Sequence, residues 1–98
     1  MSDFSYLIGN IHQAIEALIS DGPQTERVRT ACMHLFKMPN DFLNSTLSAS
    51  SKESLKTIRE TNYDDPESFR RKVQALNSFI VSAIQDTSEE WRKLYPVN

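Results

Sequence analysis

The sequence predicts an all-α protein, a compact bundle of four to six helices, of which three are substantial and cover about residues 3–20, 25–37 and 66–85. The first observation behind this prediction is that large aliphatic residues recur at three- and four-residue steps, which places them on one face of a helix. The second is the lack of strand signals, because β-branched residues nowhere alternate with polar ones and the chain contains only two glycines. The other helices are expected to be short.

Length and composition limit the classes of function. The 98 residues suffice for a single domain, residues 1–98, with one modest core. The formal net charge is −2, whereas proteins that bind nucleic acid by neutralising phosphates usually carry a basic excess, so nucleic-acid binding is disfavoured. A single cysteine excludes an internal disulfide framework, and no apolar run approaches the length of a membrane span. We therefore expect a cytoplasmic protein that does not enter a membrane.

The first predicted helix, about residues 3–20, has the clearest apolar period. Ser2 is a candidate cap at its start, and Gly22 followed by Pro23 is typical of a helix end. Gly9 stands out in the middle, because a mid-helix glycine costs about 1 kcal/mol relative to alanine. Such a glycine indicates close approach of a neighbour, either another helix of the bundle or the backbone of a partner. The apolar stripe consists of Phe4, Leu7, Ile8, Ile11, Ala14, Ile15, Leu18 and Ile19.

The second predicted helix, about residues 25–37, has Thr25 as its candidate N-cap. It is expected to end before Pro39, because a proline disfavours helical geometry at the residue that precedes it. A short helix from Asn40 is expected to follow. The apolar stripe of the second helix consists of Val28, Ala31, Cys32, Leu35 and Phe36.

The middle of the chain predicts a loop and one more short helix. The stretch "SASSK", residues 48–52, collects serines that compete with the backbone for hydrogen bonds, so a loop or hinge is expected there. Ser50 and Glu53 have the spacing of a capping box, which predicts a short helix to about residue 60.

The stretch "NYDDPESFRRK", residues 62–72, predicts the start of the third long helix. Asp65 is a good N-cap, and Pro66 suits the first turn because it needs no hydrogen-bond partner for an N–H. A calcium loop is disfavoured because the stretch has a proline where such a loop needs a glycine turn. Three basic residues fall off the apolar stripe and are expected to face water: Arg70, Arg71 and Lys72. Near Asp86 the helix is expected to break or kink, since three poor helix formers follow one another there.

The spacing of Arg29 and His34 in "RTACMH" is similar to the short Arg–His motif of HEPN ribonucleases. In that family the pair faces a cleft between two helical protomers, where the arginine stabilises phosphate charge and the histidine takes part in acid–base catalysis. The resemblance covers six residues. It implies, as an alternative function, a dimeric ribonuclease that uses Arg29 and His34.

Other chemical sites lack a necessary part. His12 and Glu16 lie one helical turn apart, but zinc needs three or four protein ligands and no further ligand is specified, so we predict no metal and no cofactor. Cys32 lies on an apolar stripe, which favours a buried thiol over a nucleophile. A helix-turn-helix DNA-binding regulator is a further alternative, because within residues 27–48 the turn "KMPN" between the two helices has the required length. Its second helix, however, has no basic residue to neutralise phosphates.

The predicted function is therefore a small non-enzymatic protein–protein interaction module. It would act as a regulator or inhibitor that occupies a surface of a partner protein, as immunity proteins, antitoxins and phage accessory factors do. Acidic residues would steer it towards a basic partner such as a nuclease or toxin. Assembly of two copies into a homodimer is compatible with this prediction. Large apolar or aromatic residues off the predicted stripes are of types enriched at interfaces: Tyr6, Met33, Met38, Tyr63, Trp91 and Tyr95. The predicted partner-binding residues are Trp91, Tyr95, Arg92, Asp64, Asp65 and Glu67, and no catalytic residue is predicted.

Overall fold

The computed structural model describes residues 3–94, without the side chains of Asp3, Glu90, Trp91 and Leu94. Its helices are α1 (Asp3–Ile19), α2 (Gln24–Phe36), α3 (Asn40–Thr46), α4 (Ala49–Glu60), α5 (Pro66–Asp86) and α6 (Ser88–Leu94). The all-α bundle of four to six helices is thus confirmed. One difference is that α4, with 12 residues, is nearly as long as α2, with 13, so four helices are substantial instead of three.

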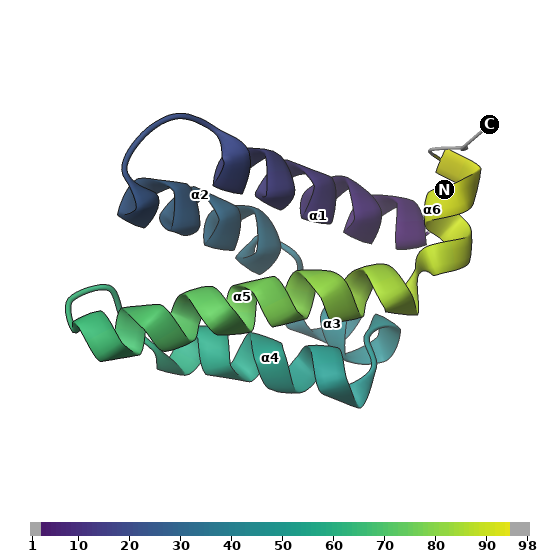
Figure 1. Ribbon diagram of the computed structural model, residues 1–98. Coiled ribbons are helices and arrows are strands. Elements are labelled where there is room, and N and C mark those ends of the chain that lie inside the picture. The colour runs from purple at the N-terminus through teal and green to yellow at the C-terminus, as the bar shows by residue number, and fades with distance from the viewer. Residues whose placement is uncertain (1–2, 95–98) are drawn as a thin grey trace.

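Two antiparallel helix hairpins form the two layers of the bundle (Figure 1). One hairpin is α1–α2 and the other is α4–α5, and the short α3 connects them. Helix α6 turns away from the end of α5 and lies beside the start of α1. The molecule measures about 40 × 29 × 20 Å.

Helix α1 buries most of the predicted apolar stripe, and Leu7, Ile11 and Ala14 are fully buried. Ile19 is different, since its side chain is 78% exposed at the last residue of the helix. The chain then turns through Gly22, whose φ of 121° lies in the left-handed region that favours glycine, so the predicted helix end is confirmed. The predicted cap Ser2 lies outside the described residues.

Arg27 of α2 holds the turn between α1 and α2. Its guanidinium donates hydrogen bonds to the carbonyl oxygens of Leu18, at 2.7 Å, and of Gly22, at 3.0 Å. The last carbonyls of a helix have no partner within it, so this side chain satisfies the Leu18 carbonyl at the end of α1 and also the Gly22 carbonyl in the turn that follows.

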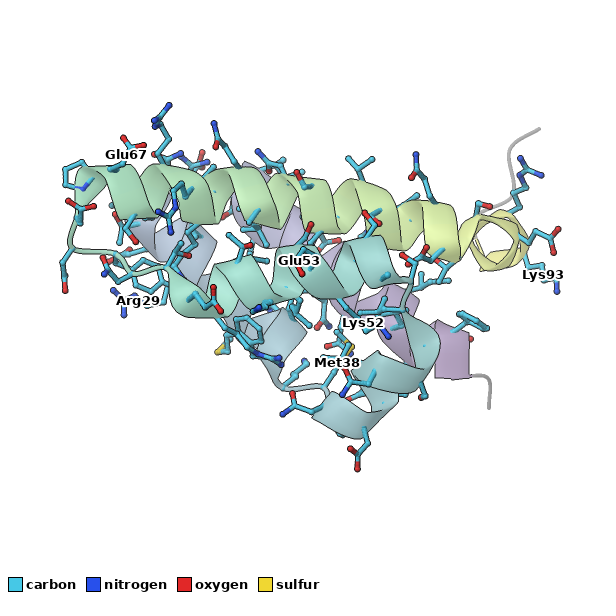
Figure 2. The ribbon with its side chains drawn as sticks, turned by 90° about the horizontal axis from the view of Figure 1, so that it is seen from below. Arg29, Met38, Lys52, Glu53, Glu67 and Lys93 are labelled. Atoms are coloured by element: carbon cyan, nitrogen blue, oxygen red, sulfur yellow. The ribbon has the colours of Figure 1, made fainter. Side chains whose placement is uncertain are left out.

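Helix α2 begins one residue earlier than predicted, and Pro23 instead of Thr25 occupies the N-cap position. The reason is that the carbonyl of Pro23, in extended geometry, already accepts a helical hydrogen bond from the Arg27 N–H at 3.1 Å. The helix ends before Pro39 as expected. Met38, which the sequence placed outside the core, is buried at the junction of α2 and α3 (Figure 2).

The predicted loop at residues 48–52 is wrong, because α4 already begins at Ala49. Its N-cap is Ser48, whose hydroxyl accepts a hydrogen bond from the Ser51 N–H at 3.3 Å, and Ser50 lies inside the helix. A hydroxyl that competes with the backbone within a loop also serves as a cap, so this serine-rich stretch allowed either outcome.

The start of α5 confirms the interpretation of Asp65 and Pro66. The Asp65 carboxylate accepts a hydrogen bond from the Ser68 N–H at 2.8 Å, and Pro66 is the first helical residue. The prediction that Lys72 faces water is wrong, because this side chain is only 4% exposed. The loop after α4 folds over the same side of α5, and Lys72 reaches the last turn of α4. The break after Asp86 is confirmed, with Thr87 between α5 and α6.

One hydrophobic core lies between the two layers. Helices α1 and α2 contribute Leu7, Ile11, Val28 and Leu35 from above, while α4 and α5 contribute Ile58, Leu76 and Phe79 from below. All of these side chains are at most 2% exposed. The core therefore fixes the inward faces of the four longer helices and leaves their outward faces on the surface of the molecule.

Candidate functional site

A hollow of about 290 Å³ lies on the outward face of α1. Its walls come from α1 and from the residue that follows α2, which the antiparallel packing of the hairpin brings alongside α1. The lining residues are Ser5, Tyr6, Gly9, Asn10, Gln13 and Lys37. Lys37 is the only charged side chain among them, so the lining carries one positive charge.

Gly9 lies in this hollow and is exposed. A Cβ atom built on Gly9 would meet no described atom within 4 Å. The expectation that another helix of the bundle approaches Gly9 is therefore wrong for the described part of the chain. The other interpretation of this glycine, close approach by the backbone of a partner, stays a prediction.

Asn10 forms the buried side of the hollow. It is only 4% exposed, and its Nδ2 donates a hydrogen bond to the Tyr6 carbonyl, one turn earlier in α1, at 2.9 Å. No described residue donates a hydrogen bond to its Oδ1 atom. Buried side-chain oxygens nearly always accept a hydrogen bond, so a bound group that carries an N–H would suit the Asn10 amide oxygen.

Two contacts shape the rest of the hollow. The ring of Tyr6 is 41% exposed and packs against Phe42 of α3 with their centres 5.3 Å apart. Lys37 Nζ donates to Gln13 Oε1 at 3.2 Å and lies 3.5 Å from Nδ1 of His34. An ammonium group has three N–H donors, so Lys37 keeps a donor for a bound group.

The structure does not bring the predicted partner-binding residues into one patch. Figure 2 shows Glu67 at one end of α5, while Lys93 of α6 lies beyond the other end. A helix of 21 residues is about 30 Å long, so the acidic residues near Glu67 and the exposed Arg92 of α6 lie on opposite ends of the bundle. Tyr95 and the side chain of Trp91 lie outside the described residues.

Two of the three acidic residues serve the fold. The Asp65 carboxylate caps α5, and Glu67 forms an ion pair with Arg70 one turn along the helix. Asp64 is exposed, and its carboxylate makes no hydrogen bond or ion pair with another described residue. Steering of a basic partner by this cluster stays a prediction that rests mainly on Asp64.

Arg29 and His34 have separate environments on α2. The guanidinium carbon of Arg29 lies 4.4 Å from the centre of the Tyr63 ring, whereas His34 contacts Lys37. Five residues on a helix turn by about 140° beyond one full turn, so the two side chains point to different sides of α2. A ribonuclease site would need a second protomer to bring phosphate to both of them.

Tyr63 was expected on the surface, but it is half-buried beside Cys32 and Lys72. Burial, together with the charge of Cys32 and the hydrogen bond to it, raises the pKa of Tyr63 to about 12. Burial also raises the pKa of the Cys32 thiol, and it lowers the pKa of Lys72. Cys32 is buried as predicted. A thiol held in its protonated form is a poor nucleophile, so this cluster serves the core.

The remaining sequence candidates have local partners. His12 Nε2 lies 3.1 Å from Glu16 Oε1, the expected pair within one turn. Within residues 3–94 no three His, Cys, Asp or Glu residues gather where they could hold a metal ion. The second helix of the helix-turn-helix candidate is α3, which has seven residues and carries Asp41 but no basic residue.

Comparisons of the chain with protein-family models, with curated proteins and with solved structures find no match. None of the helices in the described part of the chain is long and apolar enough to cross a membrane. What the protein does is therefore inferred from its own surface, where the hollow over Gly9 combines an exposed backbone, an exposed aromatic ring and an unsatisfied buried amide. Gly9 and Tyr6 had a signal in the sequence, as a mid-helix glycine and as an aromatic residue off the apolar stripe, whereas Asn10 had none.

Proposed function

We propose that this protein is a small non-enzymatic protein–protein interaction module, a cytoplasmic regulator or inhibitor that occupies a surface of a partner protein. Immunity proteins, antitoxins and phage accessory factors act in this way. The partner surface docks on the outward face of α1, over the hollow at Gly9. This placement differs from the one that the sequence suggested, which was centred on α6 and on the acidic start of α5.

The observation that carries the proposal is the open space above Gly9. A glycine in the middle of a helix costs about 1 kcal/mol relative to alanine. Nothing in the described structure requires residue 9 to lack a side chain, since no described atom lies within 4 Å of the Cβ position. A partner that approaches the α1 backbone closely would account for the glycine.

The surroundings of the hollow have the character of an interface. Tyr6 is an exposed aromatic residue at the hollow, and Met33, which is 59% exposed, lies outside the lining, one turn before Lys37. Tyrosine and methionine belong to the residue types enriched where proteins meet. Helix α6, with the exposed Arg92, lies beside the start of α1 and would extend the same surface. A second copy of the chain is one partner that this surface would accept.

The test compares proteins recovered from the native cell by three tagged versions of the chain. Gly9→Leu fills the hollow, and Val81→Leu places the same side chain at an exposed position of α5 in the other layer. A protein that the wild type and Val81→Leu recover, and that Gly9→Leu loses while it stays folded by circular dichroism, supports the proposal. Equal recovery of that protein by all three versions contradicts it.

The two alternative functions have tests of their own. A HEPN-like ribonuclease would cleave RNA, and Arg29→Ala or His34→Ala would abolish the cleavage without unfolding the protein. A DNA-binding regulator would bind duplex DNA with an affinity that falls steeply with salt. We expect no DNA binding, because α3 carries no positive charge to neutralise phosphates. We expect no RNA cleavage, because Arg29 and His34 point to different sides of α2.

A further inference from the structure

We propose that the hollow over Gly9 binds a main-chain peptide group of the partner, whose N–H donates to Asn10 Oδ1 and whose carbonyl accepts from Lys37 Nζ. This inference rests on the proposed function and specifies which chemical group of the partner enters the site. The partner segment is therefore extended or a turn, because the peptide groups within a helix or an inner strand already have partners.

Asn10 is the reason why the bound group must carry a hydrogen-bond donor. Its Nδ2 is used within α1, since it donates to the Tyr6 carbonyl, and this bond fixes which end of the amide is the oxygen. Asn10 lines the hollow and is 96% buried, and no described residue donates a hydrogen bond to its oxygen. A ligand that supplied an N–H would satisfy it, and one that supplied only acceptors would leave it unsatisfied.

Lys37 is the reason why the bound group must also carry a hydrogen-bond acceptor. Its ammonium group already has Gln13 and His34 as neighbours, and it has one more N–H to offer. A bound carboxylate would pair with Lys37 but would place its oxygens against the Asn10 oxygen. A bound ammonium would satisfy Asn10 but would repel Lys37. A peptide group carries one donor and one acceptor, so it matches both residues.

Gly9 provides the space for this group. The peptide unit is planar, and it can lie flat against a helix only where no Cβ stands in its way. Gly9 lines the hollow together with Asn10 and Lys37, and no described atom occupies the position of its absent side chain. The exposed ring of Tyr6 offers an apolar wall for the residue next to the bound peptide group.

The experiment is a titration of the isotopically labelled full chain, followed by nuclear magnetic resonance. The probe is N-methylacetamide, which is a single peptide group. Its matched controls are N,N-dimethylacetamide, which keeps the carbonyl but has no N–H, and propionate, which has only acceptors. We expect saturable shifts at the backbone amides of Gly9 and Asn10 with N-methylacetamide, and about three- to tenfold weaker binding of both controls, as for the loss of one hydrogen bond.

Two variants keep the inference falsifiable. Gly9→Leu should abolish the saturable shifts, and because this position is exposed its fold should persist. Asn10→Leu, if it folds, should remove the preference for N-methylacetamide over N,N-dimethylacetamide. Undetectable binding of all probes, or equal binding of all probes, overturns the inference, and so do shifts that Gly9→Leu leaves unchanged.

The same variants separate this inference from the proposed function. If Gly9→Leu loses the cellular partner while the three probes bind alike, the interaction module stands and the peptide-group assignment fails. If the probes discriminate as expected while Gly9→Leu still recovers the partner, the hollow binds a peptide group and the proposed docking surface is wrong.

Discussion

Lys72 Nζ donates a hydrogen bond of 2.6 Å to the carbonyl oxygen of Ile58, and this bond ties the second turn of α5 to the last turn of α4. The Ile58 carbonyl is among those that a helix leaves unsatisfied at its end. The Thr61 hydroxyl also donates to it, at 3.1 Å. Lys72 lies 4.8 Å from the centre of the Tyr63 ring as well, so one buried lysine connects α4, the loop that follows it and α5.

Lys72→Ala should lower the free energy of unfolding by about 1–3 kcal/mol, because it removes both the hydrogen bond and the buried aliphatic stem. Lys72→Met keeps most of the stem and avoids the burial of a charge, so it should lie within about 1 kcal/mol of the wild type. Urea denaturation followed by circular dichroism measures both values. The exposed Lys52, which Figure 2 shows on α4, supplies the control Lys52→Ala, and a control loss as large as that of Lys72→Ala would contradict the structural role.

Alkaline pH should destabilise the protein through Tyr63 and Cys32. Tyr63 has a pKa of about 12 in the folded state, above its ordinary value of about 10, so in this range the unfolded chain loses a proton that the folded chain keeps. Stability is therefore lost as the pH rises from about 10 towards about 12. The raised pKa of Cys32 acts in the same direction above its ordinary value, whereas the lowered pKa of Lys72 opposes both.

Tyrosinate absorbance during an alkaline titration measures this effect. One of the three tyrosines should titrate near 12 in the folded protein, and this phase should be absent from Tyr63→Phe. Titration of all three near the ordinary value, while circular dichroism still shows a folded protein, would be inconsistent with a half-buried Tyr63.

Acid should destabilise the protein through Asp86. Burial alone would raise the pKa of this carboxyl, but hydrogen bonds from the Ser51 hydroxyl and from the backbone and hydroxyl of Ser48 outweigh burial and lower it. A lowered pKa means that the contribution of Asp86 is present above about pH 4 and is lost as the pH falls through the folded value. The bond from Ser51 measures 2.7 Å and joins the start of α4 to the end of α5.

Asp86→Asn should therefore cost about 1–2 kcal/mol at neutral pH, and its stability should fall less steeply on acidification than that of the wild type. Thermal unfolding over a pH series measures both. Asp21→Asn, in the exposed turn after α1, is the control. If the stability of Asp86→Asn and of the wild type fell equally steeply with decreasing pH, the Asp86 carboxylate would not be the source of the acid sensitivity.

The two glycines should respond in opposite ways to substitution by alanine. Gly9→Ala should raise the free energy of unfolding by about 1 kcal/mol, because alanine is the better helix former and nothing described stands within 4 Å of the new methyl group. Gly22→Ala should lower it by about 1 kcal/mol or more, because φ is 121° at this position. Denaturant unfolding measures both, and destabilisation by Gly9→Ala would show that the helix needs this glycine for its own packing.

Much of the fold was predictable from the sequence, and the reason is visible in α1 and α5. The three- and four-residue spacing of Leu7, Ile11 and Ala14 fixes one side of a helix whatever that helix packs on. The cap at Asp65 and the turn at Gly22 are likewise local, since each depends on a few neighbouring residues. The start of α4 was missed because Ser48 and Ser50 are equally good caps by local chemistry.

The helical class, the inward faces of the long helices and the break after Asp86 follow from the order of residues in the chain, because each depends on residues a few positions apart. The burial of Lys72 and the exposure of Gly9, in contrast, depend on how the helices pack. The spacing of residues along the sequence predicts the side of a helix on which each residue lies, whereas burial depends on which distant segment covers that side. The loop after α4 covers Lys72, and nothing described covers Gly9, which is why the candidate site came from the fold and not from a motif.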